Sequence, residues 1–298
     1  MTGQTTLRIY LEGSMLRTAR DGTFPFMAVL EKAVHAAGWR VEWHQSDPAA
    51  RASAPDSDGY ALFHAEAPTH DRALTFRRAY HYPFWQIEPA QQRWRFHVAR
   101  SPFDADRINP QQARDFADRL RQRVIPGAPP TRDGPILIAL QGHIRRCRSF
   151  QTTSPVEMVE QVARIGRPTV ATLHPKESYD ARDMAALQAV AARHPNLRLG
   201  GDTMALLRDC PFVVTQNSAV AFDGFLLGKP AVLFAQIDFH HIALNMADDA
   251  QALEKAETHR PDFDRYLFWF LQEKAINATL PDAGARILTA MRRGGWPI

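Results

Sequence analysis

Short apolar runs alternate with segments of helical periodicity through the second half of the chain. The runs are rich in β-branched residues and too short for helices, which is typical of buried strands. The predicted strands are residues 136–140, 169–174, 197–200, 212–215 and 231–234. Between them, residues 155–165 and 181–193 have the spacing of amphipathic helices. Strands that alternate with helices of about 10–15 residues predict a parallel sheet covered by helices on both faces.

The first half of the chain carries a less regular version of this pattern. The predicted elements are strands at residues 7–13, 40–45 and 60–66, and helices at residues 26–38 and 111–124. Residues 46–58 are rich in Pro, Ser and Asp, so we expect an exposed loop there. Residues 77–99 are rich in aromatic side chains without a clear period, and we expect irregular structure. The pattern therefore predicts a β-α-β lobe.

Proline and glycine are dense in residues 125–135, which form the predicted linker. The linker separates an amino-terminal lobe, residues 1–125, from a carboxyl-terminal lobe, residues 136–260. Residues 261–298 have a mostly helical pattern, and we expect them to pack back across both lobes. A chain of 298 residues is long enough for two domains of ordinary size. The predicted fold class is α/β, with two Rossmann-like lobes.

The composition is that of an ordinary globular protein. Hydrophobic residues make up 45% of the chain and charged residues 23%, and no apolar run approaches the ~20 residues that span a bilayer. The amino end lacks a basic start followed by an apolar core, so we expect a cytoplasmic protein. The two cysteines, Cys147 and Cys210, are far apart and indicate neither a disulfide framework nor a metal site.

The formal net charge is +4, and nearly all of the positive charge comes from arginine. Many of the arginines fall between Arg72 and Arg148. The guanidinium fork matches phosphate and carboxylate, so an anionic substrate or a membrane surface would suit this charge. A solvated surface is the simpler explanation for most of these side chains. No nucleic-acid-binding motif accompanies the charge, and we expect no nucleic-acid partner.

Polar turns follow four of the predicted strands in the second half of the chain. They are residues 141–150, 174–179, 215–218 and 235–241. In a parallel sheet the carboxyl ends of the strands share one edge, where α/β proteins bind their ligands. We therefore expect the candidate binding residues to lie together at this edge.

The turn at residues 215–218, Thr-Gln-Asn-Ser, stands between a predicted strand and a predicted helix. Free backbone N–H groups and the helix dipole favour an anion at such a place. The simpler alternative is that Asn217 or Ser218 only caps the helix.

The dipeptide His-Pro occurs twice, in different settings. His174 and Pro175 end a predicted strand and precede Lys176, which points an imidazole and an ammonium at the ligand edge. His194 instead ends a helix, so we expect it at the opposite edge. As an alternative, each His-Pro pair is only a rigid turn.

Two further clusters in these turns carry side chains that are able to bind a ligand. Arg145, Arg146 and Arg148 follow the first strand of the lobe and could hold an anion, although a solvated loop is the default. Asp238, His240 and His241 lack the spacing of a helical zinc motif. A third metal ligand is not evident, so we expect no metal ion there.

Several of these segments resemble the bacterial capsule polysaccharide biosynthesis proteins, a group that includes the capsule Kdo transferases. The resemblance rests on "LHPKE" at residues 173–177, on "VTQNSAVAFDGFLLGKPAVLF" at residues 214–234, and on the strand at residues 136–141. It covers residues 136–241. Proteins of this group have the GT-B arrangement of two facing Rossmann-like lobes and use a CMP-activated sugar. We expect no further cofactor.

The resemblance implies roles for the polar turns. It implies that His174 and Lys176 contact the CMP phosphate or a sugar carboxylate, and that the helix amino end binds phosphate. Together with the turn after the first strand of the lobe, the predicted donor-binding residues are Gln141, Arg145, Arg148, His174, Lys176, Thr215, Asn217 and Ser218. Gln216 and Asn217 stand where the family turn is richer in Ser and Thr, which leaves the identity of the sugar open.

The predicted activity is that of a metal-independent, inverting glycosyltransferase. An inverting enzyme needs a base that deprotonates the acceptor hydroxyl. Glu12, after the first strand, is the first candidate for this base, with Glu66 and His64 after the third strand as the others. A turn residue in water is the alternative role for Glu12.

The expected partners are a nucleotide sugar and a glycan or glycolipid acceptor, with peripheral association at the inner membrane. The alternatives are a GT-B-fold sugar-nucleotide epimerase and a non-catalytic scaffold that binds a glycan.

Overall fold

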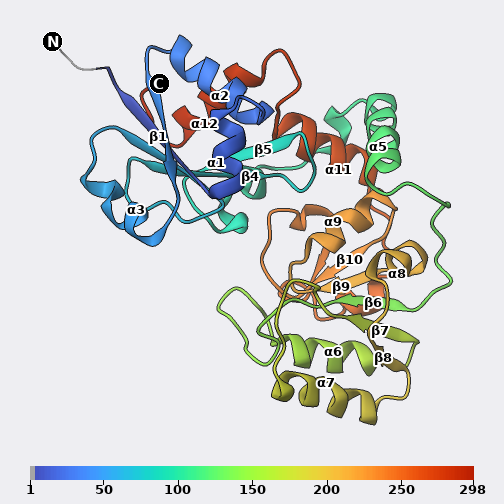
Figure 1. Cartoon of the computed structure of the whole chain (residues 1–298). Coiled ribbons are helices and arrows are strands. Elements are labelled where there is room, and N and C mark those ends of the chain that lie inside the picture. The colour runs from blue at the N-terminus through green and yellow to red at the C-terminus, as the bar shows by residue number, and fades with distance from the viewer. Residues whose placement is uncertain (1–3) are drawn as a thin grey trace. The chain divides into compact units, whose positions relative to one another are not determined.

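The computed structural model describes residues 4–298 (Figure 1). Contacts within the chain divide it into two compact units. The first unit contains the chain up to Ser101 together with Trp269–Ile298, and the second unit is Pro102–Phe268. Each unit is built around a six-stranded sheet. Within residues 4–298, no helix is both long enough and apolar enough to cross a membrane.

The sheet of the first unit has the strand order β12-β5-β4-β3-β1-β2. The strands are β1 (Thr6–Leu11), β2 (Arg40–Gln45), β3 (Tyr60–His64), β4 (Ala73–Arg78), β5 (Phe84–Glu88) and β12 (Ile276–Asn277). Strands β2, β1, β3 and β4 pair in parallel, whereas β5 pairs antiparallel with both β4 and β12. The parallel strands therefore place the residues that follow β1, β2, β3 and β4 at one edge of the sheet.

This sheet packs on three helices through a continuous apolar core. The helices of the unit are α1 (Gly13–Arg20), α2 (Pro25–Ala36), α3 (Pro48–Ser53), α4 (His97–Arg100) and α12 (Ala283–Arg293), with a π-helical turn at Trp269–Glu273. Short 3-10 turns lie at Ala54–Asp56 and Arg93–Arg95. Phe26 from α2 stacks on Trp85 with the ring centroids 4.7 Å apart, and Ile287 from α12 is fully buried in the same core. Burial of these side chains fixes the sheet face on which α2 and α12 lie.

The sheet of the second unit is parallel throughout, with the strand order β11-β10-β9-β6-β7-β8. The strands are β6 (Ile136–Ala139), β7 (Thr169–Thr172), β8 (Leu197–Leu199), β9 (Val213–Thr215), β10 (Ala231–Leu233) and β11 (Leu244–Asn245). Strands β6, β7, β9 and β10 are buried on both faces. Their continuous apolar sequences, without alternation, have this cause.

Helices cover both faces of this second sheet. They are α5 (Pro110–Val124), α6 (Pro155–Ala163), α7 (Ala181–Arg193), α8 (Thr203–Asp209), α9 (Ala219–Leu226), α10 (Ala252–Lys255) and α11 (Phe263–Phe268), with 3-10 turns at Ala105–Arg107 and His240–Ile242. Figure 1 shows α6 and α7 on one side of the sheet and α8 and α9 on the other. Helices α6 and α7 both begin with a capping box, in which Ser154 or Asp180 exchanges hydrogen bonds with the acidic residue three positions later.

The predicted fold class, α/β with two Rossmann-like lobes, is confirmed by these two sheets. Two local predictions were wrong. The predicted loop at residues 46–58 contains helix α3, because Asp47 caps it by accepting a hydrogen bond from the Ala50 N–H, with Pro48 at its first position. The predicted irregular stretch at residues 77–99 contains the end of β4 and all of β5.

The division of the chain differs from the predicted boundaries at residues 125, 136 and 261. Helix α5 belongs to the second unit, because its apolar face packs on α11 with Phe116 edge-on to Phe268, centroids 5.7 Å apart. Arg121 of α5 also forms an ion pair of 3.5 Å with Asp264 of α11. The carboxyl-terminal segment is itself divided, since α11 lies in the second unit and α12 in the first.

Candidate functional site

The residues that follow β6, β7 and β9 leave the second sheet at the same level. Ala139 lies opposite both Thr172 and Thr215, so the three strands end side by side. Gln141, His174 and Gln216 come one or two residues after these ends. The prediction that the polar turns share one sheet edge is therefore confirmed.

The turn after β9 is held by its own side chains. Thr215 is fully buried, and its hydroxyl donates a 2.7 Å hydrogen bond to the Ala139 carbonyl. The same oxygen accepts from the Ser218 N–H at 3.2 Å, and Ser218 Oγ accepts from the Val220 N–H at 3.3 Å. Ser218 thus caps α9, the alternative considered from the sequence. Asn217 donates to the Gln236 carbonyl at 3.3 Å, so it fastens this turn to the segment after β10.

His174 is oriented by two backbone contacts. Its Nδ1 accepts a 3.2 Å hydrogen bond from the backbone N–H of Lys176. The backbone N–H of His174 donates to the Tyr179 hydroxyl at 2.9 Å. A neutral imidazole whose Nδ1 accepts carries its proton on Nε2. The ring therefore offers an Nε2–H donor at the sheet edge. Lys176 is exposed and has no ion-pair partner among residues 4–298.

The other His-Pro dipeptide lies at the opposite edge, as predicted. His194 ends α7 just before β8, and β8 starts opposite the start of β7. His194 Nε2 lies 3.0 Å from Glu160 Oε1. Hydrogen bonds from His194 and Arg193 lower the pKa of Glu160 from 4.5 to about 2. His194 therefore has a structural partner on α6.

The three arginines after β6 have different surroundings. Arg145 donates to Asp183 at 2.6 Å and to Asp180 at 3.0 Å, and the hydrogen bond to Asp183 is the main reason that its pKa is raised. Arg146 is exposed. Arg148 is partly buried, with its guanidinium 4.7 Å from the centroid of the Phe150 ring, and burial lowers its pKa. No carboxylate of the described chain forms an ion pair with Arg148.

A pocket of about 650 Å³ lies between the turns that follow β6 and β7. The residues that line it are His143, Arg145, Arg146, Lys176, Glu177, Ser178, Asp180, Arg182 and Asp183. Because Arg145 is neutralised by two carboxylates, its positive charge is already compensated within the chain. Arg146, Lys176 and Arg182 are the exposed cations that remain for an anion in this pocket.

Three glutamine amides lie at this edge, of which the sequence predicted Gln141 as a donor-binding residue and did not predict Gln151 or Gln216. Gln216 is 2% exposed, and its Nε2 donates to the Thr153 carbonyl at 3.1 Å, while its Oε1 is buried without a partner. Gln141 Oε1 and Gln151 Nε2 are also buried and unpaired. The signal in the sequence was a polar residue directly after a buried strand, which applies to Gln216 as much as to its neighbours in the turn.

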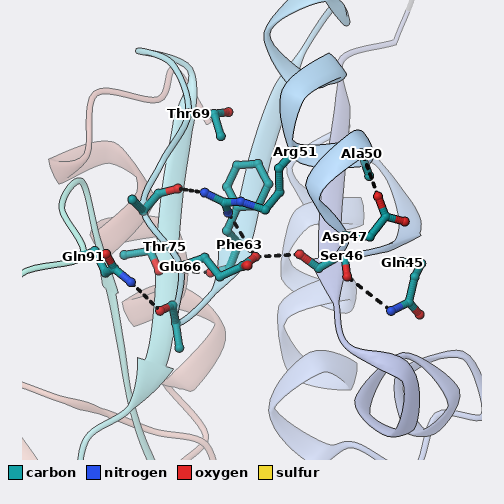
Figure 2. Close-up of polar contacts among 12 residues, drawn as sticks. Gln45, Ser46, Asp47, Ala50, Arg51, Phe63, Glu66, Thr69, Thr75 and Gln91 are labelled. Atoms are coloured by element: carbon teal, nitrogen blue, oxygen red, sulfur yellow. Dashed lines mark hydrogen bonds and ion pairs between the residues drawn. The ribbon is translucent and has the colours of Figure 1, made fainter. Parts of the chain in front are cut away.

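The carboxyl edge of the first sheet holds a closed polar network, which Figure 2 shows. Glu66 Oε2 accepts from the Ser46 hydroxyl at 2.6 Å and from Arg51 at 3.0 Å. Arg51 also donates to the Ala67 carbonyl at 2.9 Å, and its guanidinium lies 4.8 Å from the centroid of the Phe63 ring. This network joins the residues after β2 to those after β3.

The other two candidates for the catalytic base approach one another at the same edge. Tyr10 pairs with Phe63, so Glu12 after β1 and His64 at the end of β3 leave the sheet at nearby levels. Burial lowers the pKa of His64, whereas the charge of Glu12 raises it by a smaller amount. Glu12 is exposed at the start of α1, and its side chain makes no capping hydrogen bond.

The fold of this chain is similar to the folds of several proteins of known structure. No family model and no curated protein matches the chain. The chain is similar to KpsC of Thermosulfurimonas dismutans, a beta Kdo 2,7 transferase, with a TM-score of 0.52 and 11% identity over 97% of this chain and 99% of that one.

Two further structures match less closely. The beta Kdo 2,4 transferase of the same organism's KpsC has a TM-score of 0.42 and 13% identity, over 87% of this chain and 88% of that one. A UDP-GlcNAc 2-epimerase from Neisseria meningitidis has a TM-score of 0.35 and 9% identity, over 97% of this chain and its own full length. At these identities, the likeness to the 2,7 transferase shows a shared fold.

The Gly-Lys-Pro element in the resembling segment has a structural role in this chain. Lys229 is 1% exposed, and its ammonium donates to the carbonyls of Cys210, at 2.8 Å, and Thr131. Burial lowers its pKa. Gly228 has φ of +65°, a conformation that glycine adopts readily at the end of a helix. This lysine therefore joins the linker to the end of α8 and does not face the ligand edge.

The Asp238, His240 and His241 cluster forms a packed wall. Asp238 is fully buried, His240 Nδ1 lies 3.0 Å from the Ile237 carbonyl, and His241 Nδ1 lies 3.1 Å from the Tyr266 hydroxyl. Across residues 4–298, no group of three or more His, Cys, Asp or Glu side chains is arranged to hold a metal ion.

Proposed function

We propose that this protein is a metal-independent, inverting glycosyltransferase that takes its sugar from a CMP-linked donor. The acceptor is a glycan or glycolipid of a capsule or another surface polysaccharide. One observation carries the proposal: in a chain with the fold of a Kdo transferase, His174, Lys176 and the capped turn before α9 share one sheet edge. Ligands of parallel α/β sheets bind at such edges.

The donor phosphate is the group that this edge is suited to hold. The Nε2–H of His174, the ammonium of Lys176 and the amino end of α9 all favour negative charge. These groups would stabilise the charge that develops on the leaving CMP phosphate as the glycosidic bond breaks. Stabilisation of this kind is the basis for proposing that the reaction needs no metal ion.

The acceptor hydroxyl needs a base, and the first unit supplies the candidates. Glu66 Oε2 already accepts two hydrogen bonds, from Ser46 and Arg51. Glu12 carries an exposed carboxylate without a hydrogen bond or ion pair in the described chain. The lowered pKa of His64 keeps its imidazole neutral at pH 7, so it also is able to accept a proton. Glu12 is therefore the proposed base, and His64 the second candidate.

Calorimetric titration with CMP, UDP and GDP, each with and without EDTA, tests the donor proposal. We expect CMP to bind most tightly and its affinity to be insensitive to EDTA. Loss of CMP binding in EDTA would contradict the metal-independent site. If none of the three nucleotides binds, the outcome supports the non-catalytic scaffold instead.

Product analysis with a labelled CMP-sugar tests the reaction. Transfer to a glycan acceptor with inverted anomeric configuration, measured by NMR, is the expected result. Retained configuration would contradict the inverting mechanism, and an epimerised free nucleotide sugar would favour the epimerase. Co-sedimentation with vesicles that contain anionic lipid tests the proposed peripheral membrane association.

A further inference from the structure

Unpaired buried polar atoms in the second unit gather at the proposed donor edge. Within residues 102–268, six residues have a buried side-chain nitrogen or oxygen without a hydrogen-bond partner. They are Arg132, Gln141, Arg148, Gln151, Gln216 and Arg265. Four of these six, Gln141, Arg148, Gln151 and Gln216, belong to the turns after β6 and β9. Buried polar groups are normally satisfied, so a group of four unpaired atoms in adjacent turns calls for an explanation.

Backbone pairing brings the four residues near one another, because Gln141 and Gln216 follow the paired strand ends Ala139 and Thr215. Residues 150–152 run beside the end of β10, where the Thr152 N–H donates to Phe234 and the Gln236 N–H donates to Phe150. Gln216 reaches the Thr153 carbonyl, and Gln151 Oε1 accepts from the Arg148 N–H at 2.8 Å. The segment 148–153 therefore lies over the ends of β9 and β10.

The unpaired atoms include both donors and acceptors. Gln141 and Gln216 each leave an amide oxygen unpaired, whereas Arg148 and Gln151 leave N–H groups unpaired. A phosphate offers only acceptor oxygens and would leave both amide oxygens without partners. A nucleobase edge carries amine or imide donors beside carbonyl acceptors, and therefore satisfies a mixed set.

We propose that Gln141, Gln216 and the segment 148–151 form the nucleobase subsite of the donor site. This inference rests on the proposed use of a nucleotide sugar. In the subsite, the two amide oxygens accept from the N–H groups of the base. The guanidinium of Arg148, which lies over the Phe150 ring, and the amide of Gln151 donate to its ring acceptors. All four atoms are covered in the unliganded chain, so the segment 148–153 shifts when the base enters.

The test compares CMP with ribose 5-phosphate, which has the sugar and phosphate but no base. Gln141→Met removes one amide and Gln216→Leu the other, and calorimetry measures the Kd of each ligand. Gln188→Leu, at an exposed position on α7, is the matched control. A glutamine amide can turn over by 180° and exchange donor for acceptor. UMP is therefore titrated alongside CMP, because its base presents a different pattern of donors and acceptors to the same amides.

Each subsite variant should bind CMP about three- to ten-fold more weakly, because one neutral hydrogen bond is lost. Ribose 5-phosphate should bind all variants equally, and Gln188→Leu should match the unchanged chain. Equal losses for both ligands, or no loss for CMP, would overturn the subsite while leaving the nucleotide site intact. If the unchanged chain binds no nucleotide, the proposed function and the subsite fall together. Gln141 is only half-buried, so its variant keeps the test open if Gln216→Leu misfolds.

Discussion

The carboxyl edges of the two sheets carry similar polar residues in opposite states. In the first unit, Glu66, Arg51 and Ser46 satisfy one another across the turns after β2 and β3 (Figure 2). In the second unit, Gln141 and Gln216 keep amide oxygens that are buried and unpaired. The first edge therefore has its Glu66 network complete before any ligand arrives, whereas the second edge leaves these two amide oxygens without partners.

From this difference we infer that the Glu66 network supports the structure of the first edge, whereas the unpaired amides of the second edge recognise a ligand. An unpaired buried polar atom costs about 1–3 kcal/mol, so it lowers stability until a partner appears. A completed network instead fixes the backbone around it, here beside Ala65, whose φ of +55° is unusual for alanine. We therefore expect substitutions at the Glu66 network to change stability most, and substitutions at the second edge to change binding most.

The largest effect is expected at Glu12, whose carboxylate is not part of the network. Glu12→Gln should lower kcat by about 10²–10⁴-fold, the usual contribution of a general base, and leave CMP affinity unchanged. Steady-state kinetics with a CMP-sugar gives kcat, and calorimetry gives the affinity. Glu66→Gln is the control, with a smaller loss of kcat. A larger loss at Glu66 would show that a networked carboxylate performs the chemistry and would break the distinction between the edges.

The next largest effect is expected for His174→Ala. Loss of a hydrogen bond to a charged phosphate costs about 1.5–3 kcal/mol, so CMP should bind roughly one to two orders of magnitude more weakly. His194→Ala provides the matched control, because it removes the same residue type from the opposite edge of the same sheet. Comparable CMP affinities in the two folded variants would mean that His174 does not contact the donor.

Arg51→Met should lower the free energy of unfolding by about 1–2 kcal/mol. The substitution removes the ion pair with Glu66, the hydrogen bond to Ala67 and the contact with Phe63, from a side chain that is 22% exposed. Urea unfolding measures the change, and a double-mutant cycle with Glu66→Gln isolates the pair. Wild-type stability combined with weakened CMP binding would assign this network to recognition instead.

The smallest effect concerns the acid stability of the opposite edge of the second sheet. The pKa of Glu160 falls from 4.5 to about 2 in the folded chain, so folding favours its ionised form. Its contribution to stability is complete above about pH 4.5 and is lost as the pH falls towards 2. Thermal unfolding at a series of pH values should show this loss, and Glu160→Gln should reduce it. An unchanged pH profile in Glu160→Gln would contradict the assignment.

Sequence periodicity predicted the second sheet well for a physical reason. Parallel strands buried on both faces have continuous apolar sequences, and their helices have clear caps such as Asp180. Strand β5 escaped prediction because its buried positions include Gln86 and Glu88, which hide the apolar pattern. Helix α3 escaped because its Pro and Ser content indicated a loop, although Asp47 and Pro48 are the start signals of a helix.

The position of the candidate site was predictable from the sequence, but the hydrogen-bond and ion-pair partners of its side chains were not. Residues after parallel strands share an edge whatever their partners, so His174 and Thr215 were expected together. Whether a side chain is free depends on residues far away in the sequence. Arg145 was predicted to bind the donor, yet Asp180 and Asp183 neutralise it from more than thirty positions along the chain. That role for Arg145 stays a prediction.

The buried ammonium of Lys229 has a consequence for dissecting this protein. Residues 125–135 have the composition of a flexible joint, yet Thr131 accepts from Lys229, Pro126 accepts from Arg208 at 3.0 Å, and Arg132 donates to Gly228 at 2.6 Å. We expect residues 125–135 to resist limited proteolysis in spite of their prolines. A fragment that began at residue 136 would lack these hydrogen bonds and helix α5. An autonomous second unit must therefore start upstream of Pro110.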